Sequence, residues 1–122
     1  MKKIRAFSAV ALVGALAALF LTPSCCGDPH KAYERVLRAN LHTLRDVIGQ
    51  YHEDRGRYPE RLEDLITAGY LRRVPIDPYT KSQATWRLTL ENRPETEGRP
   101  GIVDVRSGAR GTSRDGRPLG SL

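Results

Sequence analysis

The longest regular pattern of apolar residues lies in the first half of the chain. It consists of five large side chains: Leu37, Leu41, Leu44, Ile48 and Tyr51. They follow one another at steps of four, three, four and three, with charged residues between them, so they form one apolar stripe on a helix. The pattern predicts an α-helix over residues 32–55 that ends at Gly56, because glycine readily takes the left-handed conformation of a helix C-cap.

Two shorter segments follow this helix. We expect Pro59 in the first turn of a short second helix, where its missing N–H costs little. Its contact face is expected to consist of Leu62, Leu65 and Ile66. Gly69 is expected to end this helix. Two prolines then interrupt Val74–Tyr79, which predicts an extended connection across the core.

Residues 84–90 alternate between apolar and polar side chains, which is typical of a half-buried strand. The side chains expected on the buried face are Trp86, Leu88 and Leu90. A second β-rich run, 101–106, is expected to pair with the first in antiparallel orientation, whereas the glycines of 107–122 predict a loop. The expected fold class is α+β: a long N-terminal α-helix packed on a small antiparallel β-sheet, with a loop-rich C-terminal segment.

Residues 1–26 form a separate segment. Three basic residues precede the apolar run 6–21, and small residues lead to Cys25, an order that matches an export signal or a membrane anchor. Three outcomes remain open: lipidation of Cys25 as in bacterial lipoproteins, cleavage after Ser24, or retention as an anchor. We therefore expect an exported protein of the bacterial cell envelope with one domain over 27–122. This domain is expected in the periplasm, where the N-terminal segment or a lipid holds it at the membrane.

The predicted domain is less basic than the composition of the whole chain suggests. The whole sequence has 20 basic and 14 acidic residues, but three of the basic residues belong to the export segment. The remaining charges of both signs are interleaved along the domain, which favours a solvated mixed-charge surface. A nucleic-acid partner is not expected, since it would require basic residues gathered on one face.

The sequence has no recognisable catalytic motif. Its histidines, His30, His42 and His52, do not have the spacing of a metal site, and neither a G-x-S-x-G sequence nor a phosphate-binding loop is present. The two cysteines, Cys25 and Cys26, are adjacent and lie at the predicted processing site rather than beside a base. We predict that the protein is not an enzyme.

Three segments in order resemble the globular part of the type II secretion system protein G family, the major pseudopilins. They are Gln50–Pro59 at the end of the helix, with Leu62 and Leu65 after it, Gly69–Tyr79 in the connection, and Gly101–Gly108 with the loop up to Gly116. The resemblance covers 37–116 and implies a pilin-like α+β domain. It also implies a role in the pilus-like assembly that drives exported proteins through the outer membrane, with other pseudopilus subunits as partners.

The sequence departs from this family at two places. Family members carry a glycine cleavage point followed by Phe-Thr-Leu-x-Glu, whereas no acidic residue occurs in 1–27 of this chain. The family's C-terminal loop also binds calcium through oxygen ligands, and the resemblance implies Ser107 and Asp115 as the candidate ligands here. Arg110 stands where an aspartate of that loop is expected, and nearby arginines disfavour a divalent cation.

Two functions are therefore expected. The first is a non-enzymatic pseudopilin-like component of a type II secretion system that acts through protein–protein contacts in the envelope. The alternative is a free-standing periplasmic lipoprotein whose pilin-like domain serves as a binding or scaffold module. The N-terminal segment separates them, because Pro23 and Pro29 interrupt the continuous helix that a filament subunit needs.

Overall fold

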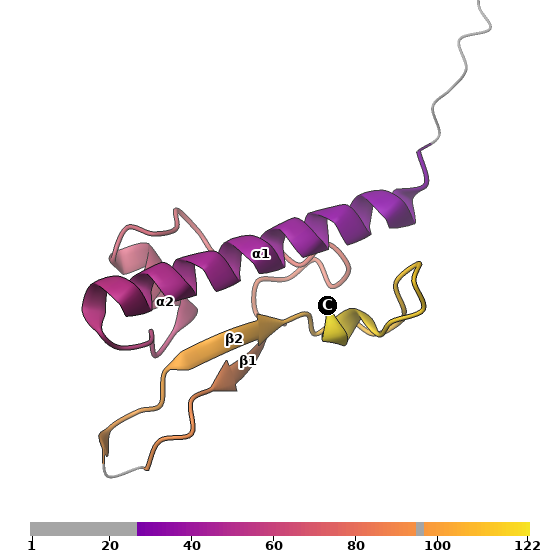
Figure 1. Cartoon of the computed structure of the whole chain (residues 1–122). Coiled ribbons are helices and arrows are strands. Elements are labelled where there is room, and N and C mark those ends of the chain that lie inside the picture. Colours follow the sequence, from indigo (N-terminus) through magenta and orange to yellow (C-terminus); the bar gives the residue numbers. More distant parts are fainter. Residues whose placement is uncertain (1–26, 95–96) are drawn as a thin grey trace, which may run out of the picture.

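The protein is described by a computed structural model over residues 27–94 and 97–122. Its elements are, in order, α1 (Pro29–Arg55), α2 (Leu62–Thr67), β1 (Arg87–Leu90), β2 (Ile102–Arg106) and the 3-10 turn η2 (Leu119–Ser121). The fold is α+β, as predicted, with α1 lying along one face of a two-stranded antiparallel sheet (Figure 1). Within the described ranges, the helices are too short or too polar to cross a membrane.

Helix α1 has a defined residue at each end. The carboxylate of Asp28 accepts a hydrogen bond from the backbone N–H of His30 (3.0 Å), and Pro29 occupies the first helical position. At the other end Gly56 has φ 69° and donates its N–H to the carbonyl of His52 (2.8 Å). The predicted C-cap is therefore confirmed, while the helix begins three residues earlier than expected because Asp28 caps it.

The apolar stripe of α1 is the centre of the core. Its five predicted residues are all buried, and they pack with Ile102 and Val105 of β2 and with Leu119 near the C-terminus. Arg45 holds the same surfaces together from the side: its guanidinium donates to Asp104 (2.8 Å) and to the carbonyls of Val105 (3.0 Å) and Leu122 (2.7 Å). The predicted burial of this face is confirmed.

The second helix is shorter than predicted. Pro59 lies before α2 rather than in its first turn, and its carbonyl accepts the N–H of Ile102 (2.7 Å), which ties the turn after α1 to β2. Helix α2 begins at Leu62, because the carboxylate of Asp64 accepts the N–H of Arg61 (2.9 Å) at the N-cap. Gly69, with φ 85°, follows the end of the helix as expected.

The sheet pairs Leu88 with Val105 and Leu90 with Ile102, with an irregular register between these pairs. Trp86 is buried, but Leu88 and Leu90 are 43% and 49% exposed. The predicted burial of these two leucines is wrong. Helix α1 packs over β2, and β1 lies at the edge of the sheet that the helix does not cover (Figure 1).

The C-terminal segment is mostly irregular, as its glycines predicted. It returns along α1, and the buried Leu119 of η2 fixes its end to the core. An isolated bridge pairs Thr112 with Pro118 and closes the intervening loop, which lies beside the first turns of α1 (Figure 1).

Candidate functional site

A buried carboxylate joins the connection before β1 to the segment after β2. Asp77 Oδ1 accepts the backbone N–H of Tyr79 (2.9 Å), and its Oδ2 accepts the hydroxyl of Ser107 (2.5 Å). Both side chains are fully buried, and Ser107 Oγ also accepts the N–H of Ala109 (3.0 Å). Because each polar atom has a partner, the pair stabilises the fold and leaves no unused donor or acceptor for a ligand.

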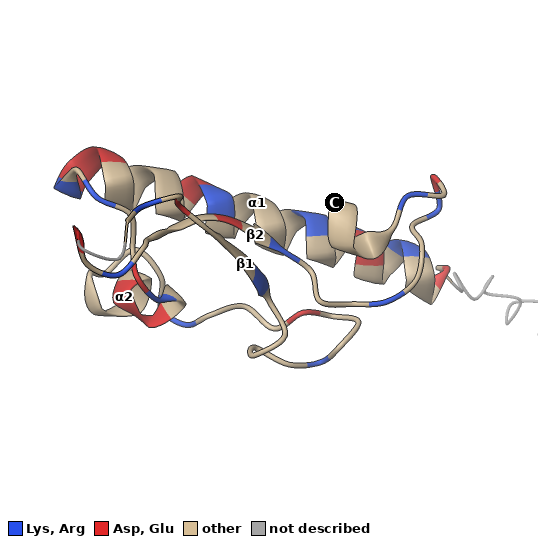
Figure 2. Cartoon of the chain, turned by 90° about the horizontal axis from the view of Figure 1, so that it is seen from below, with Lys and Arg blue, Asp and Glu red and all other residues tan. Residues whose placement is uncertain are grey.

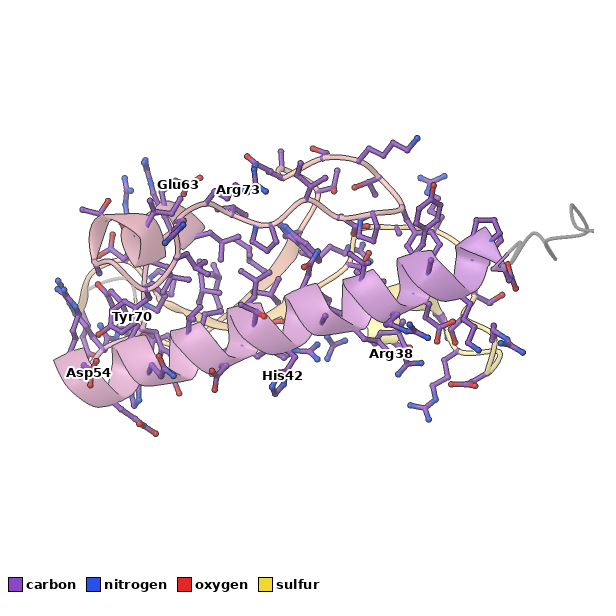
Figure 3. All side chains as sticks on the ribbon, turned by 90° about the horizontal axis from the view of Figure 1, so that it is seen from above. Arg38, His42, Asp54, Glu63, Tyr70 and Arg73 are labelled. Atoms are coloured by element: carbon purple, nitrogen blue, oxygen red, sulfur yellow. The ribbon has the colours of Figure 1, made fainter. Side chains whose placement is uncertain are left out.

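A second cluster joins the first turns of α1 to the C-terminal loop; we call Glu34, Arg38, Arg114 and Asp115 the charge cluster. Glu34 accepts the backbone N–H of Arg114 (3.0 Å) and pairs with the guanidinium of Arg38 (2.7 Å). Arg38 also reaches Asp115 (3.2 Å), and Figure 3 shows its side chain directed toward the C-terminal loop. The hydrogen bond from the backbone N–H of Arg114 and the hydrogen bonds from the guanidinium of Arg38 lower the pKa of Glu34 below its ordinary 4.5.

This pKa predicts that acid weakens the attachment of the C-terminal loop. A carboxyl group whose pKa is lowered by folding stabilises the folded chain above its unfolded pKa, and this contribution is lost as the pH falls through the lower folded value. The stability advantage of the wild type over Glu34→Gln should thus be constant above about pH 5 and shrink below about pH 4.5. Urea denaturation from pH 7 to pH 3 measures it.

Glu53→Gln is the control for this series, because it removes one exposed carboxylate from the same helix away from the charge cluster. An advantage of the wild type over Glu34→Gln that persists unchanged at pH 3 would contradict the assignment. The effect is expected to be modest, since surface ion pairs contribute little.

The two candidate calcium ligands bind other groups. Ser107 donates to Asp77, whereas Asp115 is 59% exposed and pairs with Arg38. In the part of the chain that the structure describes, no three His, Cys, Asp or Glu residues are placed to hold a metal ion. Calcium requires six to eight oxygen ligands, so this arrangement does not fit a calcium site.

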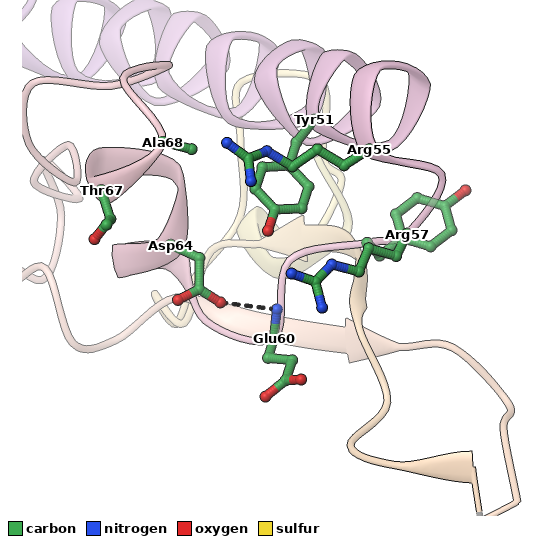
Figure 4. A pocket seen from close by; sticks show the side chains of 8 residues that line it. Tyr51, Arg55, Arg57, Glu60, Asp64, Thr67 and Ala68 are labelled. Atoms are coloured by element: carbon green, nitrogen blue, oxygen red, sulfur yellow. Dashed lines mark hydrogen bonds between the residues drawn. The ribbon is translucent and has the colours of Figure 1, made fainter.

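A hollow of about 310 Å³ lies between the end of α1 and α2 (Figure 4). Its lining includes Tyr51, whose ring lies 5.0 Å from the guanidinium carbon of Arg55, and the carboxylate of Asp64, which accepts the N–H of Glu60 (3.0 Å). Arg57 faces the same space. Two cations face two carboxylates, and no nucleophile lies beside a base, so the hollow offers no recognisable catalytic arrangement.

The tyrosines at this end pack as structural residues. Tyr70 lies edge-on to the buried Tyr51, with 5.8 Å between ring centroids, and donates its hydroxyl to Asp54 (2.5 Å; Figure 3). That hydrogen bond raises the pKa of Tyr70. Tyr58 stacks on His52 at 4.0 Å, which places this histidine in turn packing.

Some of these residues had no role in the sequence-based predictions. Asp77 was expected only as part of an extended connection, although an aspartate before Pro-Tyr is typical of a side chain that accepts the next backbone N–H groups. Glu34 and Arg38 have the i, i+4 spacing of a helix ion pair. The predicted lipidation site, Cys25, and the predicted export segment lie outside the described residues.

Comparisons of the chain with protein-family models, with curated proteins and with solved structures found no match.

Proposed function

We propose that this protein is a non-enzymatic, pseudopilin-like component of a type II secretion system that binds other subunits in the cell envelope. One observation carries the proposal: the three segments that resemble the protein G family contact one another. Pro59 of the first segment accepts the N–H of Ile102 in the third, and Asp77 of the second binds Ser107 of the third. These segments therefore form one structural unit, as the resemblance requires of a pilin-like domain.

The arrangement of charge is consistent with a protein-binding role. Cations and carboxylates are interleaved along α1 and the loops of the described chain (Figure 2), whereas a nucleic-acid partner needs basic residues gathered on one face. The described residues also hold no constellation typical of catalysis. Contacts with other subunits would therefore use the exposed surface of the domain.

Deleting the gene in the bacterium that encodes this protein tests the role in secretion. We expect type II cargo to accumulate in the periplasm and to fall in the medium, with recovery when the wild-type gene is supplied in trans. Unchanged cargo secretion in the deletion strain would contradict the proposal.

The second candidate is a free-standing periplasmic lipoprotein with a pilin-like domain, and the start of α1 favours it. Asp28 caps the helix and Pro29 occupies its first position, so α1 has its own N-terminus directly after 1–27. A filament subunit instead needs one helix that continues from the membrane into the domain. This feature argues for an accessory subunit or a lipoprotein rather than for the core of a filament.

Mass spectrometry of the mature N-terminus distinguishes these arrangements. Protein purified from native membranes and carrying a diacylated Cys25 would exclude the filament core and support the lipoprotein. A chain that retains residues 1–21 would exclude the lipoprotein and leave a membrane-anchored subunit. Cys25→Ser serves as the matched control, because it removes the lipid acceptor and leaves the apolar segment intact.

A further inference from the structure

Strand β1 has one unpaired edge. The sheet contains two strands, and no other strand in the described ranges pairs with the far side of β1. The N–H of Glu91 donates to the carbonyl of Gly101 (2.9 Å) on the β2 side. Backbone groups of successive strand residues point to opposite edges, so those of Leu88 and Leu90 point away from β2, toward the free edge.

The side chains of the same two leucines lie on the helix-facing side of the sheet. Leu88 is opposite Val105 and Leu90 is opposite Ile102, and residues directly opposite each other project to the same face. The β2 residues are fully buried beneath α1, whereas the leucines remain almost half exposed. An apolar strand with a free edge readily pairs with another chain.

The sequence of β1 and its next residue is self-complementary about Thr89. It reads Arg87, Leu88, Thr89, Leu90 and Glu91. Antiparallel pairing with a second copy, with a two-fold axis at Thr89, places leucine opposite leucine and arginine opposite glutamate. Within the described chain, Glu91 Oε1 accepts the N–H of Gly101 (3.2 Å) and lies 3.4 Å from the guanidinium of Arg93, while Glu91 Oε2 accepts no hydrogen bond.

We propose that β1 is a self-association edge, through which two copies of this chain form a continuous four-stranded sheet in the order β2-β1-β1-β2. The pairs of Leu88 with Leu90 of the second copy supply the hydrogen bonds, because their backbone groups face the free edge. The Thr89 pair lies on the axis as a closely spaced pair without hydrogen bonds. This inference goes beyond the proposed secretion role and does not depend on it.

The two-fold arrangement also covers the exposed leucines. It places both α1 helices on the same face of the sheet, each over its own β2 and about 14 Å apart, since the two β2 strands are three strand spacings apart. Helices are about 10 Å wide, so four leucine side chains fill the space between them. A groove of about 380 Å³, lined by Leu62, Trp86 and Leu88 together with polar residues of 60–63 and 83, reaches Leu88 at the margin of this space.

Position-specific cross-linking tests the proposal on the full-length chain in detergent, with Cys25 and Cys26 changed to serine. In the closely spaced pair the two Cα atoms lie about 4.5 Å apart, within reach of a disulfide, so Thr89→Cys should form disulfide-linked dimers under mild oxidation. Arg87→Cys is the matched control. Its two copies lie about 13 Å apart in the proposed register, too far to bridge, so its cross-linking should be at least about tenfold slower.

Leu88→Lys combined with Leu90→Lys provides the second arm. Both side chains are exposed in the single chain, so the variant should keep its circular dichroism spectrum and a cooperative thermal transition, while cross-linking through Thr89→Cys falls to the rate of Arg87→Cys. Equal rates for the two cysteine variants would overturn the proposal. Cross-linking through Thr89→Cys that withstands both lysines would overturn it as well, as dimerisation would then use another surface.

Discussion

Leu44→Asp is expected to leave the domain unfolded at room temperature. Leu44 lies in the middle of α1 and is fully buried in the core that α1 forms with β2. Far-ultraviolet circular dichroism should show loss of most helical signal, and a thermal scan should show no cooperative transition.

The expected magnitude follows from two costs. Truncating a buried leucine costs about 2–5 kcal/mol of the free energy of unfolding. Placing a carboxylate without a partner in an apolar site adds several kcal/mol or forces the group to take up a proton. The total stability of a domain is typically only about 5–15 kcal/mol. One substitution therefore removes most or all of it.

Val36→Asp is the matched control, because it introduces the same charge into the same helix. Val36 is 46% exposed, so its replacement should change the free energy of unfolding by no more than about 1 kcal/mol. If Leu44→Asp melted like the wild type, the stripe would have to lie at the surface in solution, and the buried arrangement of α1 on β2 would be refuted.

The long helix was predictable because its signal is local. A regular apolar spacing and a glycine able to take φ 69° suffice to place the body and the end of α1. The predicted start was wrong by three residues, because it depends on one hydrogen bond from the backbone N–H of His30 to the carboxylate of Asp28. The predicted start of the short helix was wrong, since Pro59 lies before α2 and its carbonyl accepts the N–H of Ile102 in β2.

The exposure of Leu88 and Leu90 could not be read from alternation. Alternation shows that both side chains share a face, and the pairing with Val105 and Ile102 agrees. Whether that face is covered depends on how many strands one helix can span. A helix about 10 Å wide over strands about 4.8 Å apart covers β2 well and leaves part of β1 open.

The residues that join the C-terminal segment to the rest of the fold are distant in sequence. Ser107 and Asp77 are separated by 30 positions, and Arg114 and Glu34 by 80. The sequence shows that each residue is polar, but only the return of the chain along α1 brings the partners together. This is why the C-terminal segment was predicted as a loop without its attachment points.

Gly108→Ala is expected to destabilise the domain by about 1–3 kcal/mol or more, as overpacked sites do. A Cβ at position 108 would lie 2.1 Å from the carbonyl oxygen of Thr85 and 3.1 Å from its carbonyl carbon. These are backbone atoms, so the clash is not relieved by rotating a side chain. The segment after β2 must move away from the segment before β1, which strains the neighbouring bond between Ser107 and Asp77.

The control for this substitution is Gly49→Ala in α1. No atom lies within 4 Å of a Cβ built at Gly49, and alanine is favoured over glycine in a helix by about 0.5–1 kcal/mol, so this variant should be slightly more stable than the wild type. Thermal melting should therefore separate the two alanine variants in opposite directions, by about 4–8 °C for each kcal/mol. If Gly108→Ala melted at the same temperature as Gly49→Ala, residues 85 and 108 would not be in contact in solution. The attachment of the C-terminal segment through Ser107 would then be refuted as well.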